Sequence, residues 1–113
     1  MMVLGRIKGE SVMVGDDLLV TVAEMETDRA LILVHRRVSG GRLSFIDEIA
    51  RKWLGPREAI SLADKAACSV VMVREGKVRI GFDVPLNLTV HRMEVYAAIQ
   101  GLAWEGLGPL SRE

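Results

Sequence analysis

Few side chains in this sequence have the types and the spacing that catalysis requires. Asp16 and Asp17 form a carboxylate pair, but they follow Gly15, and a Gly-Asp-Asp sequence between two apolar stretches is typical of a turn. His91 and Glu94 could serve as a base and an acid, yet helix capping explains their spacing across a strand-to-helix junction. The sequence shows no glycine-rich phosphate loop and no metal-ligand cluster. We therefore expect a protein that is not an enzyme and needs no metal or other cofactor.

Cys68 is the only cysteine of the chain, so an intramolecular disulfide bond is excluded. The valines that follow it, Val70 and Val71, favour a small buried apolar residue over a reactive thiol. A thiol nucleophile would need a nearby base, and neither His35 nor His91 lies in a recognisable cysteine-protease signature.

The composition predicts a compact β-rich domain with a little helix. Of the 113 residues 50% are apolar and only 4% aromatic, so aliphatic side chains must form the core. Fifteen basic and fifteen acidic residues give a net charge of zero, so any nucleic-acid site must be a local patch. No apolar run approaches the ~18 residues of a membrane span, and the N-terminus lacks the apolar region of a signal peptide. We therefore expect a cytoplasmic protein that does not contact a membrane.

Most of the chain reads as short strands joined by polar turns, and the last element reads as a helix. The residue ranges expected to be strands are 3–7, 11–14, 18–25, 29–35, 68–73, 77–82 and 88–91, and the helix is expected over 93–102. The four strands between 18 and 82 that flank residues 26–28 and 74–76 should form two β-hairpins.

The middle of the chain has a different periodicity. Apolar residues recur at spacings of three and four at Ile46, Ile49, Ala50, Trp53 and Leu54. This spacing predicts a helix over residues 46–54 that ends at Gly55-Pro56 and buries Ile49 and Trp53. Residues 56–67 fit either a helix that begins at Pro56 or a short strand through residues 60 and 62, and periodicity does not decide between them.

Three stretches resemble the carbon storage regulator (CsrA) family of translational regulators. They are "MVLGRIKGESVMVGDD" (2–17), "GKVRIGFDVP" (76–85) and "LTVHRMEVYAAIQ" (88–100). They follow one another in the family's order and together cover about a third of the chain. The resemblance implies a mainly β fold with short α-helices, in which small sheets of two five-stranded subunits intertwine as a dimer.

The resemblance also implies an RNA site between the first strand of one subunit and the last strand of the other. The principal residues carried over are Arg6 and Arg92, both expected at the surface, where a guanidinium can bond a phosphate and a base edge. The residues implied to line the same surface are Leu4, Gly5, Val84, Pro85, Leu88, Val90 and His91. The expected ligand is a GGA element in the loop of an mRNA 5′ leader or a small regulatory RNA.

Three departures from the family pattern weaken the expected RNA surface. Gly5 stands where Ser or Thr is common in the family, Ile7 stands where a basic residue is common, and Leu86 stands where Lys is frequent. An alternative function is therefore a protein-interaction module with weakened or lost RNA binding. A protein antagonist is a further expected partner, since such a partner can act away from the RNA surface.

The chain is about twice as long as members of the family, through either an insertion within residues 23–69 or a duplication. A shift of 48 residues aligns Glu10 with Glu58 and, without a gap, Val22 with Val70. We favour duplication, with halves 1–54 and 55–105, a tail at 106–113 and a monomeric pseudo-dimer; a homodimer is the alternative. The second site would then be silent, because Leu54 takes the position of Arg6, and Ser44 or Ile46 that of Arg92.

Overall fold

The computed structural model describes residues 1–38, 43–63 and 65–107, which form nine strands and one helix. The strands are β1 (Met2–Arg6), β2 (Ser11–Val14), β3 (Leu18–Met25), β4 (Ala30–Arg36), β5 (Asp47–Leu54), β6 (Ala59–Ala63), β7 (Ala66–Arg74), β8 (Lys77–Asp83) and β9 (Val90–Arg92), and the helix is α1 (Met93–Gln100). The mainly β fold predicted from the sequence is confirmed. No helix in the described part of the chain is long and apolar enough to cross a membrane.

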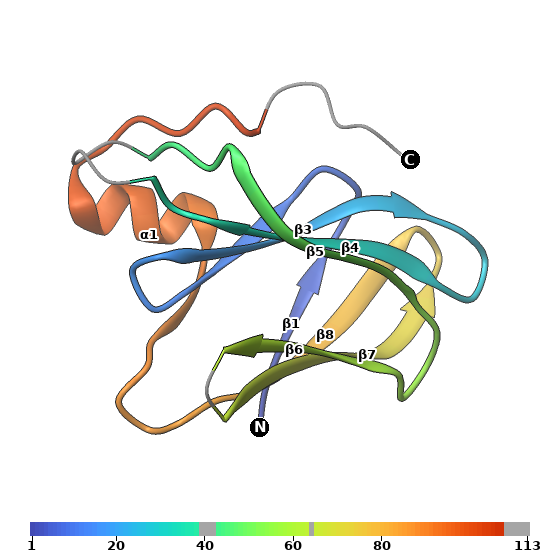
Figure 1. Cartoon of the computed structure of the whole chain (residues 1–113). Helices are drawn as coiled ribbons and strands as arrows, with labels where there is room; N and C mark the ends of the chain where they lie inside the picture. The colour runs from blue at the N-terminus through green and yellow to red at the C-terminus, as the bar shows by residue number, and fades with distance from the viewer. Residues whose placement is uncertain (39–42, 64, 108–113) are drawn as a thin grey trace.

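The strands form two antiparallel sheets that pack against each other (Figure 1). One sheet has the order β1-β8-β7-β6, and the other has the order β5-β4-β3-β2-β9. The main core lies between them and is aliphatic, with side chains such as Val20 and Ile32 from one sheet and Val70 and Ile80 from the other. Cys68 belongs to this core, and burial raises the pKa of its thiol to about 12, as expected for an unreactive cysteine.

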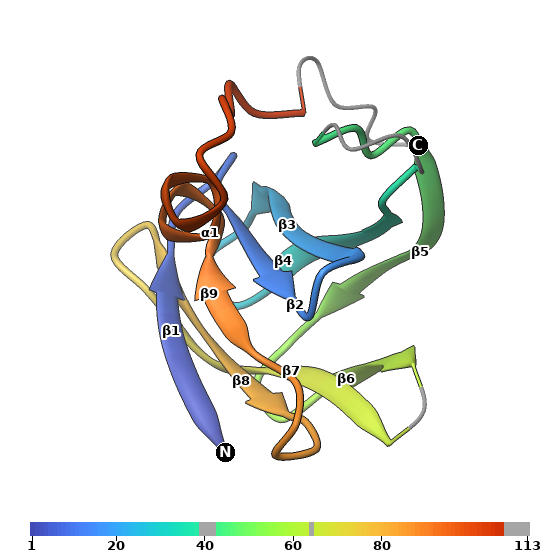
Figure 2. The same ribbon diagram turned by 90° about the vertical axis from the view of Figure 1, so that its left-hand side faces the viewer.

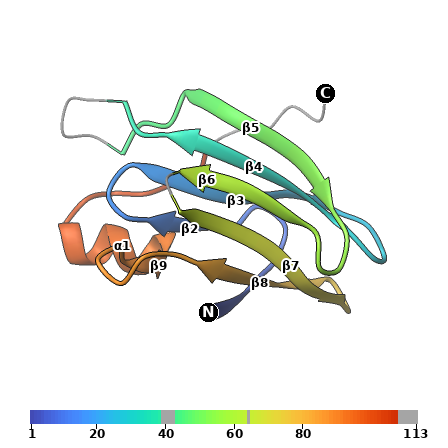
Figure 3. The same ribbon diagram turned by 60° about the horizontal axis from the view of Figure 1, so that its bottom comes forward.

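Helix α1 lies on the outer face of the five-stranded sheet (Figures 1 and 3). Met93 and Tyr96 of the helix pack against Met13 of β2 and Leu19 of β3. Gly101 ends the helix with φ 66°, a left-handed conformation that glycine adopts readily. The outer face of one sheet is therefore used to hold the helix next to β9.

Residues 47–54 form strand β5, so the prediction of a helix over 46–54 was wrong. The pairing of β5 with β4 slips by one residue, since Glu48 pairs with His35 and Ala50 with Val34. Ile49 is the extra residue of this β-bulge, and a bulge interrupts the two-residue alternation of a strand. Beyond the bulge the strand carries apolar residues on both faces, since Ala50 and Leu54 face the main core and Trp53 packs on the outer face, and these residues therefore fall at spacings of three and four.

The burial expected for that helix was also wrong in part. Ile49 is exposed, and Trp53 is half-buried on the outer face, where it packs against Ala23, Leu31 and Leu33. In the ambiguous stretch 56–67, the strand alternative was right: β6 spans Ala59–Ala63 and pairs with β7.

The backbone pattern of the first half recurs in the second half at a shift of 48 residues. The Gly9 N–H donates to Val22 O at 2.7 Å, and the Arg57 N–H donates to Val70 O at 2.8 Å. Gly9 and Arg57 both have a positive φ, at 89° and 71°. In the first turn the Ile7 N–H donates to the Glu10 carboxylate at 2.9 Å, and in the second turn the equivalent Gly55 N–H donates to the Glu58 carboxylate at 2.6 Å.

The strand pairing repeats at the same shift. Leu4 of β1 pairs with Ile80 of β8, and Lys52 of β5 pairs with Ile32 of β4. The irregularity in the β3–β4 pairing, between Val22 and Glu24, has its counterpart in the β7–β8 pairing, between Val70 and Met72. β5 thus stands in one sheet where β1 stands in the other.

Candidate nucleic-acid interface

β1 and β9 each lie at the edge of a sheet. Among the described residues β1 pairs with β8 alone and β9 with β2 alone. Each strand therefore has one row of backbone N–H and C=O groups without a partner strand. Such groups can bond the edges of unstacked bases, which is how single-stranded RNA is read.

The two edge strands run in the same direction and converge beside α1 (Figure 2). At one end Met2 of β1 and Val90 of β9 line the same hollow. At the other end the Arg6 side chain bonds Glu94, two residues beyond the end of β9. We call the surface formed by residues 2–6 and 84–92 the β1/β9 strip.

Arg6 lies inside the protein and is only 5% exposed, so the prediction that this side chain lies at the surface was wrong. Its two terminal nitrogens donate to the carboxylate oxygens of Glu94 at 2.8 and 2.9 Å. The same guanidinium donates to Ser11 O at 3.2 Å and lies 3.6 Å from a carboxylate oxygen of Glu10. Arg6 therefore fastens β1 to the start of β2 and to the first turn of α1.

Glu94 is the functional partner that the sequence reasoning missed, since it was assigned to helix capping. The hydrogen bonds from Arg6 are the main reason that the pKa of the Glu94 carboxyl lies below its usual value. The Glu94 side chain is 57% exposed, so this ion pair faces solvent on one side. The available signal was an acidic residue in the first turn of the helix that follows Arg92.

Arg92 ends β9 and is exposed, as predicted. Within the described part of the chain its guanidinium takes part in no hydrogen bond or salt bridge, so its donors can bind a ligand. His91 precedes it and is half-buried, while Val90 is buried in the main core. The strip therefore carries its exposed positive charge at the end nearest α1.

The other predicted residues form the apolar part of the strip. Val84, Pro85, Leu88 and Val90 line one hollow of about 210 Å³, together with Met1, Met2 and the exposed Leu86. Leu4 is half-buried against the main core, and Gly5 lies between it and Arg6 on β1. The nine predicted residues thus lie on β1, on β9 and in the segment that precedes β9, but the Arg6 and Val90 side chains are buried and add no exposed group to the strip.

The corresponding surface beside β5 lacks these charges. Leu54, at the position equivalent to Arg6, is fully buried in the main core. Ser44 is half-buried and Ile46 is 83% exposed, and neither lies in a strand. Among the described residues, the four-stranded sheet has no strand beyond β6 to match β9.

The sequence is similar to known regulators. Residues 50–101 match the model of the CsrA family, described as the "Global regulator protein family". This match extends from β5 to the end of α1, so it contains five strands and one helix.

One relative is the translational regulator CsrA of Oleidesulfovibrio alaskensis, which is 38% identical over 45 residues. The alignment covers 40% of this chain and 58% of the relative's length. No solved structure matches the chain.

Proposed function

We propose that this chain, whose residues 50–101 match the CsrA family model, is a translational regulator of that family that binds GGA-containing RNA loops at its β1/β9 strip. The observation that carries the proposal is the meeting of two free strand edges, one of which ends in the exposed Arg92. The RNA partners are an mRNA 5′ leader or a small regulatory RNA, and the regulator acts in the cytoplasm, where mRNA is translated.

The strip has the chemistry that an RNA loop needs. The free backbone groups of β1 and β9 supply donors and acceptors for base edges. The hollow around Pro85 and Leu88 supplies apolar contact for an unstacked base, and Arg92 supplies a fork that bonds a phosphate or a guanine edge. Arg6 acts as a positioning residue, since its guanidinium holds β1 against α1 and is covered by protein.

We further propose that the chain is a monomeric pseudo-dimer with a single RNA site. The repeated turns and strand pairings at a shift of 48 residues support two copies of one unit. The family match begins at residue 50, and β5 repeats the place of β1, so the second copy begins at β5 and not at residue 55. Since β1 pairs with β8 and β9 with β2 inside one chain, both sheets form without a second molecule.

The test is the binding of a short RNA hairpin with GGA in its loop, compared with the same stem carrying an altered loop. Arg92→Ala should weaken binding to the GGA hairpin by about 1–3 kcal/mol, the scale of a good arginine contact. Lys52→Ala is the control, because Lys52 is also an exposed cation on a strand, but it lies on β5.

Two results would contradict the proposal. If Arg92→Ala binds the GGA hairpin as tightly as the wild-type protein, or loses no more affinity than Lys52→Ala, the strip is not the site. If the wild-type protein does not distinguish the two hairpins, GGA recognition is absent. The function would then be that of the protein-interaction module.

A further inference from the structure

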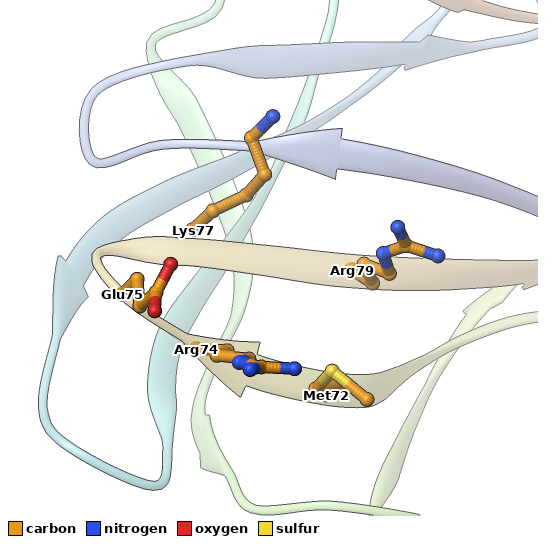
Figure 4. Close-up of a pocket in the computed structure, with 5 residues that line it drawn as sticks. All are labelled: Met72, Arg74, Glu75, Lys77 and Arg79. Atoms are coloured by element: carbon orange, nitrogen blue, oxygen red, sulfur yellow. The ribbon is translucent and has the colours of Figure 1, made fainter.

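A second cationic surface lies at the tip of the β7–β8 hairpin. A groove of about 360 Å³ is lined by Met72, Arg74, Glu75, Lys77 and Arg79 (Figure 4). The three basic residues are exposed, and no acidic side chain in the described part of the chain forms a salt bridge with them. Three positive charges and one negative charge make the groove a site for an anion.

The groove adjoins β1, the first strand of the β1/β9 strip. Arg79 pairs with Gly5 of β1, and the Lys77 side chain crosses over Gly5. A Cβ atom built on Gly5 would lie 3.2 Å from Cδ of Lys77, so glycine leaves room for the lysine stem. Figure 4 shows Lys77 extending away from Arg74, so the basic groups spread across the hairpin.

The equivalent hairpin of the other half has lost this charge. At the shift of 48 residues, Arg74 corresponds to Glu26, Arg79 to Leu31 and Lys77 to Arg29. The Arg29 guanidinium is bonded to Glu26, and Leu31 is buried beneath Trp53 of β5. Of the two equivalent hairpins, the one beside β1 therefore carries the basic groove, and the Arg6–Glu94 pair and Arg92 lie on the same side of the molecule.

We propose that this groove binds phosphate groups of the RNA that flank the element held in the β1/β9 strip. The inference rests on the proposed function and adds to it a contact that does not depend on sequence. Arginine forks and a lysine ammonium are suited to phosphate oxygens, and such contacts place the RNA without reading its bases.

The test uses the two hairpins described above, titrated at several salt concentrations. Lys77→Ala and Arg79→Leu are the variants, and leucine is tolerated at the equivalent position Leu31 on a matching backbone. Each variant should weaken binding to both hairpins by the same factor and lower the salt slope by about 0.7–0.9. The affinity lost between about 50 and about 200 mM salt should therefore shrink about threefold for each contact removed. Lys52→Ala, an exposed lysine of β5, is the matched control and should change neither value.

The outcomes separate this inference from the proposed function. If Lys77→Ala and Arg79→Leu keep the wild-type affinity and salt slope while Arg92→Ala still reduces the preference for GGA, the groove does not bind RNA and the strip does. If the groove variants reduce the preference for GGA itself, the groove reads bases, and its assignment to phosphates is overturned. If the wild-type protein binds neither hairpin, both proposals fail together.

Discussion

Replacement of Arg6 by alanine should destabilise the fold, although the sequence placed this residue on an exposed edge. The guanidinium donates two hydrogen bonds to the Glu94 carboxylate and one to Ser11 O, and the side chain is almost fully buried. Arg6→Ala removes all three bonds and the packing of the arginine stem at the junction of β1 and α1.

The expected loss follows from the exposure of the two partners. A hydrogen bond to a charged group contributes about 1.5–3 kcal/mol to the free energy of unfolding. The Glu94 side chain is 57% exposed, so water can hydrate its carboxylate in the Arg6→Ala protein. The free energy of unfolding therefore falls by much less than it would for a fully buried ion pair. Together with the lost bond to Ser11 and the lost packing, we expect a decrease of about 2–4 kcal/mol.

The assay is urea unfolding followed by circular dichroism or fluorescence. Arg92→Ala is the control, because its exposed side chain should change the free energy of unfolding by less than about 0.5 kcal/mol. An Arg6→Ala protein within about 0.5 kcal/mol of wild type would show that the Arg6–Glu94 pair does not hold β1 in place. RNA binding should fall in both variants, but only Arg6→Ala should lose stability as well.

Three further outcomes are expected. The pKa of Glu94 is lowered from 4.5 in the folded protein, so the Arg6–Glu94 pair adds to the free energy of unfolding above pH 4.5, and this contribution is lost as the pH falls through the folded pKa. Glu94→Gln should therefore reduce the fall in stability at acid pH, and an unchanged fall would argue against the pair. Trp53→Ala should cost about 1–3 kcal/mol, less than a fully buried tryptophan, because the ring is half-buried under Arg29; a loss above about 4 kcal/mol would contradict this placement. Light scattering should show a monomer that binds one GGA hairpin, whereas a dimer with two equal sites would favour the inserted homodimer.

Sequence patterns predicted the strands well where turns and alternation agreed. β2 and β3 were predicted to the residue, because polar turns bound short apolar runs on both sides. β5 was missed because Ala50 and Leu54 face the main core while Trp53 packs on the outer face, which gives spacings of three and four, and only the pairing with β4 reveals the bulge at Ile49. The shortness of the window left the helix and the strand indistinguishable by periodicity.

The positions of the candidate site residues could be predicted from the sequence, but the burial of Arg6 could not. The resemblance placed the strip residues on the first strand, on the last strand and in the loop before it, and in the structure the ends of these two strands converge beside α1. The burial of Arg6 was not predictable, because its partner Glu94 lies 88 residues away and meets it only when β1 and α1 fold together. An arginine between apolar residues reads as an edge charge until a carboxylate is found for it.

The finding that residues 47–54 form a strand supplies the first strand that the second copy of the proposed duplication needs. With a helix at 46–54, the second copy would have had no first strand, whereas β5 supplies one in the same register as β1. At the position of Arg6 this strand carries Leu54, a core residue that needs no carboxylate partner. Replacing a buried ion pair by an apolar side chain need not cost stability. One half can therefore have lost its RNA surface while its strands still complete the core on which the β1/β9 strip depends.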